Sequence, residues 1–190
     1  MTVSYRTKTA IVCFMHFLTW PLFLPSIVMC KLFKSGGVFN FAAKLISLIP
    51  GKIGTYLRAS FYCMTLSECK YDIAVGFASF FAYPTSKVGR QVVIGCFSII
   101  GTADIGNNVF VSSRVSVMGG KYQHDTSTTD TKVFYDKISI GDRSWLGEGS
   151  IVMCDLESDC TVSAGSVVTK PMPQGRTAIG NPARFLKKGL

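Results

Sequence analysis

The side chains best suited to acid–base chemistry in this 190-residue chain are its two histidines, His16 and His124. An imidazole titrates near neutrality, so it can take a proton from a hydroxyl group without special tuning of its surroundings. His16 lies in an apolar run, where a packed or membrane-interface role is expected. His124 lies in the polar stretch 119–125 (GGKYQHD) and is the better candidate for a base, although a histidine in a loop is more often simply exposed.

The seven cysteines do not point to a second reactive site. They form no C-x-x-C pair, and an odd number of thiols scattered through apolar stretches indicates reduced cysteines in a cytosolic setting. A zinc centre of the carbonic anhydrase kind needs about three histidine ligands, and two histidines cannot supply them. We therefore expect neither a metal nor a cysteine nucleophile.

A repeat between Val88 and Lys170 would carry these groups. Its aliphatic residues recur mostly every six positions, with one step of five and one of ten: Val88, Ile94, Ile100, Ile105, Val111, Val117, Ile140, Leu146, Val152, Val162 and Val168. Glycine follows six of them, and we expect it to adopt the backbone angles of a tight corner. A period of six fits neither an amphipathic helix nor an alternating strand. It predicts a parallel β-helix that turns a corner every six residues and buries one aliphatic column.

Two motifs make the repeat specific. They are residues 140–149 (IGDRSWLGEG), and residues 164–170 (AGSVVTK) followed by residues 180–184 (GNPAR). With them, the chain from about residue 75 to residue 190 resembles the hexapeptide-repeat (left-handed β-helix) acyltransferases. Residues 49–58 (IPGKIGTYLR) resemble a phrase found in polysaccharide- and sugar-modifying O-acetyltransferases of that family. The resemblance implies a left-handed coil, acetyl-CoA as co-substrate, and a homotrimer with active sites between subunits.

The resemblance also implies roles for single residues. His124 matches the catalytic histidine, which the family places in a glycine-containing loop before the tryptophan motif. The positions that match contacts of the acetyl-CoA donor are Trp145, Gly147, Ser163, Ala164, Thr169, Lys170 and Arg184. Basic side chains suit a polyphosphate ligand at Lys170 and Arg184, although a solvated surface charge is the alternative. Trp145 has core packing as its alternative.

Three features of the repeat depart from a regular pattern. Glu148 stands where the family commonly has a small residue, which puts the shape of the donor channel in doubt. The ten-residue step from Val152 to Val162 leaves the register near Ser163 open. Residues 123–137 are polar and lack an inward aliphatic residue, so we expect an extruded loop, where binding and catalysis tend to reside.

The net charge of +9 is concentrated at the two ends of the chain. Residues 1–70 carry +7, residues 71–170 carry −2, and the last twenty residues carry +4. A basic, apolar N-terminus suggests an anionic membrane surface, and no nucleic-acid-binding motif is present. Residues 10–30 lack charged side chains and are just long enough to span a bilayer, but Pro21 and Pro25 interrupt them. This favours a re-entrant or interfacial hairpin; a single span and a buried hairpin stay open.

Two short helices are expected after that run, over residues 38–48 and 52–64. Their apolar residues recur at helical spacing, and Lys44, Lys52 and Arg58 lie off the apolar faces. Such helices would either lie in the lipid headgroup region or pack on the first coil of the repeat.

The sequence thus predicts a mainly β protein in three parts. These are an apolar, helical, membrane-associating region (1–70), a left-handed β-helix (71–170) with the loop at 123–137, and a C-terminal cap (171–190). The predicted function is acetyl-CoA-dependent O-acetylation of a sugar or lipid-linked saccharide at the cytoplasmic face of the plasma membrane. N-acetylation of an amino sugar or other small acceptor and a noncatalytic scaffold remain alternatives.

Overall fold

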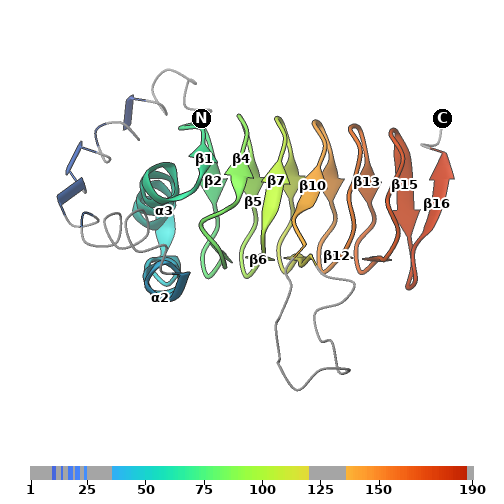
Figure 1. The fold of residues 1–190 in the computed structure, drawn as a ribbon, viewed down its shortest axis with the longest axis horizontal. Coiled ribbons are helices and arrows are strands. Elements are labelled where there is room, and N and C mark those ends of the chain that lie inside the picture. Colours follow the sequence, from blue (N-terminus) through green and yellow to red (C-terminus); the bar gives the residue numbers. More distant parts are fainter. Residues whose placement is uncertain are drawn as a thin grey trace.

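The computed structural model describes residues 36–119 and 136–187, together with eight helical positions near the N-terminus: Ala10, Ile11, Phe14, Phe17, Leu18, Trp20, Pro21 and Leu24. Helices α2 (Gly36–Ser47) and α3 (Gly51–Thr65) precede a series of short strands that begins at Glu68. These strands wind into a three-sided parallel β-solenoid, with the two helices at one end and β16 at the other (Figure 1).

Each side of the solenoid is one sheet, and consecutive strands of the chain pass from one sheet to the next. Sheet A contains β1 (Glu68–Cys69), β4 (Lys87–Val88), β7 (Ala103–Ile105) and β10 (Ile138–Ile140). Sheet B contains β2 (Ala74–Val75), β5 (Val93–Ile94), β8 (Phe110–Val111), β11 (Trp145–Leu146), β13 (Thr161–Val162), β15 (Arg176–Ile179) and the antiparallel β16 (Arg184–Lys187). Sheet C contains β3 (Phe80–Phe81), β6 (Ile99–Ile100), β9 (Ser116–Val117), β12 (Ile151–Val152) and β14 (Val167–Val168).

The predicted aliphatic column forms the core of this solenoid. All eleven repeat residues from Val88 to Val168 are at most 3% exposed. The ten-residue step contains a further inward residue, Leu156, which bridges Ile140 in the preceding coil and Met172 in the following one. The register beyond Val152 is therefore regular, because one side of this coil is simply four residues long. The predicted parallel β-helix is confirmed, and its left-handed sense stays a prediction.

The corners differ from the sequence-based expectation. Left-handed backbone angles occur at the third position after the inward residue rather than at the glycine that follows it, for example at Phe97 (φ 58°) and Asn108 (φ 56°). The glycine is needed for another reason. A Cβ on Gly95 would lie 2.5–2.8 Å from the backbone of Ser112 and Ser113 in the next coil, so these two coils stack this closely because Gly95 lacks a side chain.

Buried serines lie at the corner between sheets B and C, where a hydroxyl can form hydrogen bonds with backbone groups of the next coil. Ser98 is fully buried; its hydroxyl donates to the Ser112 carbonyl (3.0 Å) and accepts from the Val115 N–H (3.1 Å). Ser150 is equally buried at the matching position, but its hydroxyl has no partner among the described residues. Ser98→Ala should therefore lower the free energy of unfolding by about 1–3 kcal/mol, because it leaves two buried backbone groups without a hydrogen-bond partner. Ser150→Ala should change it by less than about 0.5 kcal/mol. Urea unfolding of both variants measures the difference, and equal losses would contradict this account of the corner.

The N-terminal helices cap the first coil. Strand N–H groups of each coil donate to carbonyls of the next one, as in Gly76 N–H to Ile94 C=O (2.8 Å), but the backbone groups on the outer edge of the first coil have no preceding coil to pair with. Asn40 Nδ2 donates to one of them, Ala82 C=O (3.2 Å). Arg58 is the larger capping group and is only 1% exposed, so the expectation that it lies off the buried face is wrong. Its guanidinium is held by backbone carbonyls, which sequence spacing does not reveal.

The N-terminal apolar run is described only in part. Among the described residues, no helix has the length and apolar character needed to cross a bilayer. The hairpin predicted for residues 10–30 lies largely outside the described residues, as does His16.

Candidate active site

The solenoid is interrupted by an insertion between β9 and β10. Its two described ends touch, since a Cβ on Gly119 would overlap the carbonyl group of Asp136. The insertion therefore leaves and rejoins the scaffold at one point. His124 belongs to this insertion and lies outside the described residues, as does most of the predicted 123–137 loop.

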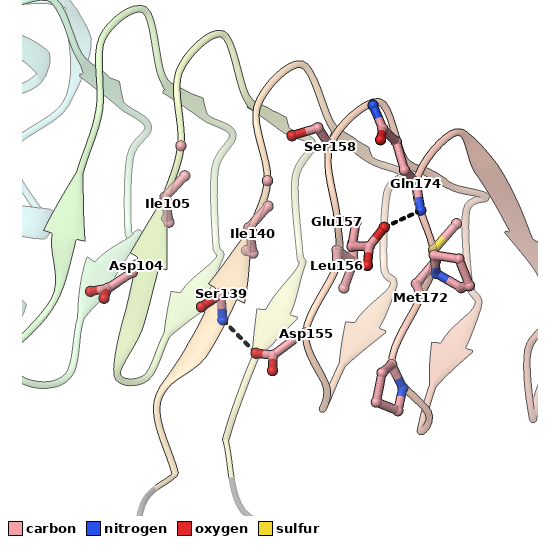
Figure 2. Close-up of a pocket in the computed structure, with 14 residues that line it drawn as sticks. Asp104, Ile105, Ser139, Ile140, Asp155, Leu156, Glu157, Ser158, Met172 and Gln174 are labelled. Carbon is pink, nitrogen blue, oxygen red and sulfur yellow. Dashed lines mark hydrogen bonds between the residues drawn. The ribbon is translucent and has the colours of Figure 1, made fainter.

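A trough of about 830 Å³ lies on sheet A beside the rejoining end of the insertion (Figure 2). Asp104 lines its near side and forms an ion pair with Lys137 (Nζ to Oδ1, 2.9 Å), the residue that follows Asp136. Further along, Asp155 Oδ1 accepts from the Ser139 N–H (2.7 Å). The trough thus combines carboxylate and hydroxyl groups with the chain segment that joins the insertion.

Sequence reasoning missed this trough. Its far part is formed where two sides of the solenoid are short, at Leu156 and Met172, which are bridges rather than full strands. There Glu157 Oε2 accepts from the Gln174 N–H (2.8 Å). The four-residue steps that end at Leu156 and Met172 are visible in the sequence and would have indicated the hollow.

Three of the predicted donor-binding residues come together at the corner between sheets B and C. The Gly147 N–H donates to the Val162 carbonyl (2.7 Å), and a Cβ on Gly147 would lie 2.6 Å from the Ala164 nitrogen. Gly147 therefore stacks directly on Ser163 and Ala164 of the next coil. Ala164 is exposed, so backbone of this corner is open to a ligand.

The predicted basic residues lie farther along the same end of the solenoid. Thr169 and Lys170 follow β14 directly and are exposed, and Arg184 opens β16 and is also exposed. The Ala183 N–H donates to the Val167 carbonyl (2.8 Å), so the segment that leads to Arg184 runs beside β14. Arg184 itself pairs with Ile179 on sheet B, so the structure places it near the start of β14, while Thr169 and Lys170 follow the end of that strand.

Trp145 lies on the outer surface of sheet B. Its side chain is 52% exposed, so core packing is excluded, and its Nε1 donates to Ser112 Oγ (3.1 Å). It pairs in register with Phe110 of the preceding coil, and Phe110 pairs with Val93. All three are exposed, and they form an apolar column on this side of the solenoid.

Glu148 is paired with a basic residue of the preceding coil. Arg114 Nη2 lies 2.6 Å from Glu148 Oε1, and both side chains are more than half exposed. An exposed pair of this kind contributes at most about 1 kcal/mol to stability. The ion pair matters locally, because it places a carboxylate and a guanidinium at the same corner as Gly147.

Two of the described thiols, those of Cys160 and Cys69, are poor candidates for nucleophiles. Burial raises the pKa of the Cys160 thiol, and the hydrogen bond shared with the Cys63 thiol, together with burial, raises the pKa of the Cys69 thiol. Both shifts disfavour the thiolate, the reactive form. Within residues 36–119 and 136–187, no group of three or more His, Cys, Asp or Glu side chains could hold a metal ion.

Comparison with known proteins agrees with this geometry. No family model matches the chain. The bifunctional protein GlmU of Prochlorococcus marinus (strain MIT 9313) is 32% identical over 131 residues, which cover 55% of this chain and 29% of GlmU. Among solved structures, a maltose O-acetyltransferase from Clostridium difficile 630 has a TM-score of 0.64 at 22% identity, covering 79% of this chain and 86% of that chain. A hexapeptide-repeat acetyltransferase from Vibrio cholerae O1 biovar eltor, complexed with acetyl-CoA, has a TM-score of 0.63 at 15% identity, covering 81% and 87%.

This chain has the hexapeptide-repeat fold of these acetyltransferases. The resemblance predicted from the two sequence motifs is confirmed at the level of the fold. The chain spans less than a third of the length of GlmU.

Proposed function

We propose that this protein is an acetyl-CoA-dependent O-acetyltransferase that acts on a sugar or a polysaccharide precursor. One observation carries the proposal: the insertion that contains His124 leaves and rejoins the solenoid at a point that borders the polar trough on sheet A. His124 is the fifth residue after Gly119, so covalent geometry limits the two Cα atoms to within about 18 Å of each other. The sugar acceptor is supported by the maltose O-acetyltransferase neighbour and by residues 49–58.

In the proposed reaction, His124 Nε2 or Nδ1 takes the proton of an acceptor hydroxyl as its oxygen attacks the thioester carbonyl. The carbon–sulfur bond then breaks, and the coenzyme A sulfur leaves with the proton that the imidazole returns. The products are the acetyl ester and free coenzyme A, and no acyl-enzyme is formed. Asp104, Ser139 and Asp155 line the adjacent trough and are suited to hydrogen-bond the other hydroxyls of a sugar.

The donor would lie along the corner between sheets B and C. The stacked Gly147, Ser163 and Ala164 present backbone groups there, which suit the amides of a pantetheine arm. The exposed Lys170 and Arg184 lie farther along and suit phosphates. Trp145 would stand near the catalytic histidine of a neighbouring subunit. A homotrimer would also cover the apolar column of Val93, Phe110 and Trp145, since exposed apolar columns of this kind mark interfaces.

Lys170→Ala is expected to raise the KM for acetyl-CoA about tenfold and to leave kcat nearly unchanged, because it removes a charge-assisted phosphate contact remote from the thioester. With acetyl-pantetheine, which has no nucleotide, the variant and the wild type should behave alike. Lys87→Ala, an exposed lysine on sheet A, is the matched control and should change neither constant. An unchanged KM for acetyl-CoA would remove Lys170 from the donor site.

The function is tested by incubating the purified full chain with labelled acetyl-CoA and a panel of free and lipid-linked glycans. We expect label in an alkali-labile ester of one glycan class, with release of one thiol per ester. Alkali-stable label would indicate transfer to nitrogen. Absence of transfer and of thiol release with every acceptor would favour the noncatalytic scaffold.

A further inference from the structure

The outer face of α2 is apolar although it packs against nothing in the described part of the chain. Phe41 and Leu45 are 70% and 60% exposed, and their spacing of four places them on one side of the helix; Leu48, directly after the helix, is also 60% exposed. The opposite side carries the buried Phe39, Ala43 and Ile46. Helix α2 is therefore apolar on two faces, and only one of them is used by the fold.

The charges around this face have a single sign. The first 67 residues contain no aspartate and no glutamate. Lys44 on α2 and Lys52 at the start of α3 are exposed, and Ile53 beside Lys52 is 67% exposed. Exposed apolar side chains between lysines are the composition of a surface that lies in the headgroup region of an anionic bilayer.

Helices α2 and α3 are fixed to the solenoid, so whatever binds them also orients the solenoid. The Ala78 N–H donates to the Ser47 carbonyl at the end of α2 (2.8 Å). The Tyr62 ring of α3 packs edge-on against Phe81 of the first coil, with ring centroids 4.9 Å apart. Figure 1 shows both helices at the same end of the solenoid.

We infer that the outer face of α2, continued by Lys52 and Ile53, is the docking surface through which the protein binds an anionic lipid bilayer. Binding there holds the first coil at the membrane and directs the opposite end, with Lys170 and Arg184, away from it. A second copy of the chain is a poorer occupant, because two such faces would bring lysines together without any acidic partner. Residues 1–35 are a poorer occupant for the same reason, since their charged side chains are all basic. This inference does not depend on the acetyl transfer reaction.

The test uses full-length single-tryptophan variants in a Trp20→Phe/Trp145→Phe background. One carries Phe41→Trp, on the proposed surface, and its matched control carries Ile179→Trp, at a position that is 47% exposed on β15. Both are mixed with phosphatidylcholine vesicles that contain about one-third phosphatidylglycerol, with and without bromine on the acyl chains. Circular dichroism checks that both variants are folded.

We expect the protein to sediment with the anionic vesicles. Brominated lipid should reduce the fluorescence of the Phe41→Trp variant by about half or more and leave that of the Ile179→Trp variant unaffected. Replacing the anionic lipid with phosphatidylcholine, or adding salt, should weaken sedimentation several-fold. Sedimentation without quenching at position 41 overturns the inference, because another segment then makes the contact. Absence of sedimentation also overturns it, as does equal quenching of both reporters. Dimers in light scattering without vesicles, together with no sedimentation, would identify a second copy as the occupant.

Discussion

Replacing His124 with alanine is expected to reduce the rate of acetyl transfer by about 10²–10⁴-fold, the usual contribution of a positioned general base. The acceptor hydroxyl is a weak nucleophile unless its proton is removed during attack. Cys160 and Cys69 are poor alternative nucleophiles, because the pKa shifts of both thiols disfavour the thiolate. The KM for acetyl-CoA should stay within about threefold of the wild-type value, since the residues proposed to bind the donor lie elsewhere on the solenoid.

The measurement is thiol release from acetyl-CoA in the presence of the acceptor, with ester formation followed in parallel. His16→Ala is the control, because it removes the other histidine of the chain and should leave turnover unchanged. Equal turnover of the His124→Ala variant and the wild type would eliminate the base role. Loss of activity in both variants, with altered circular dichroism, would indicate a folding defect instead.

The sequence predicts the solenoid because its physical requirements fall on single residue types. Every corner needs one inward aliphatic side chain, about half of the corners also need a position without a Cβ, and both features follow a period of six. The side of the solenoid that ends at Leu156 is not predicted by this pattern, because its four-residue step keeps the inward residue but breaks the period of six. A search for inward residues that allows short sides would recover it.

The candidate site is predictable only where it is built from the repeat itself. Gly147, Ser163 and Ala164 meet because the repeat places equivalent positions of consecutive coils on one corner. The trough is different, since Asp104, Ser139 and Asp155 come from three coils and have no common motif. Their proximity depends on the length of the insertion and on the short sides beyond it, which a search for regular six-residue steps does not detect.

The same limit applies to the N-terminal end of the solenoid. A stack of parallel coils ends in a row of unpaired N–H and C=O groups, which must find acceptors and donors when they are buried. Arg58 is the largest such donor. Its Nε donates to the Val75 carbonyl (2.8 Å) in the first coil, and its Nη1 donates to the carbonyls of Ser47 (3.2 Å), the last residue of α2, and of Ile49 (2.7 Å). A single guanidinium thus joins α2, α3 and the first coil.

Arg58→Met is therefore expected to lower the free energy of unfolding by about 3–5 kcal/mol, the second large effect predicted for this chain. Burial lowers the pKa of this guanidinium, which shows that it is held at a solvation cost. Replacing a buried charge with an apolar side chain is often neutral when its charged partner is removed as well. Here the partners of Arg58 are backbone carbonyls, which no substitution removes. The loss of their hydrogen bonds therefore outweighs the solvation cost that the substitution relieves.

Arg58→Lys should recover only part of that stability, about 1–2 kcal/mol, because an ammonium group lacks the fork that reaches carbonyls on two sides. Lys52→Ala, in the first turn of the same helix, is exposed and should change stability by less than about 0.5 kcal/mol. Denaturant unfolding followed by circular dichroism measures all three variants. A denaturant unfolding curve for Arg58→Met that coincides with that of the wild type would mean that the carbonyl groups at the edge of the first coil need no side-chain donor. The helical layer would then be attached to the solenoid by aromatic packing alone, through contacts such as that between Tyr62 and Phe81.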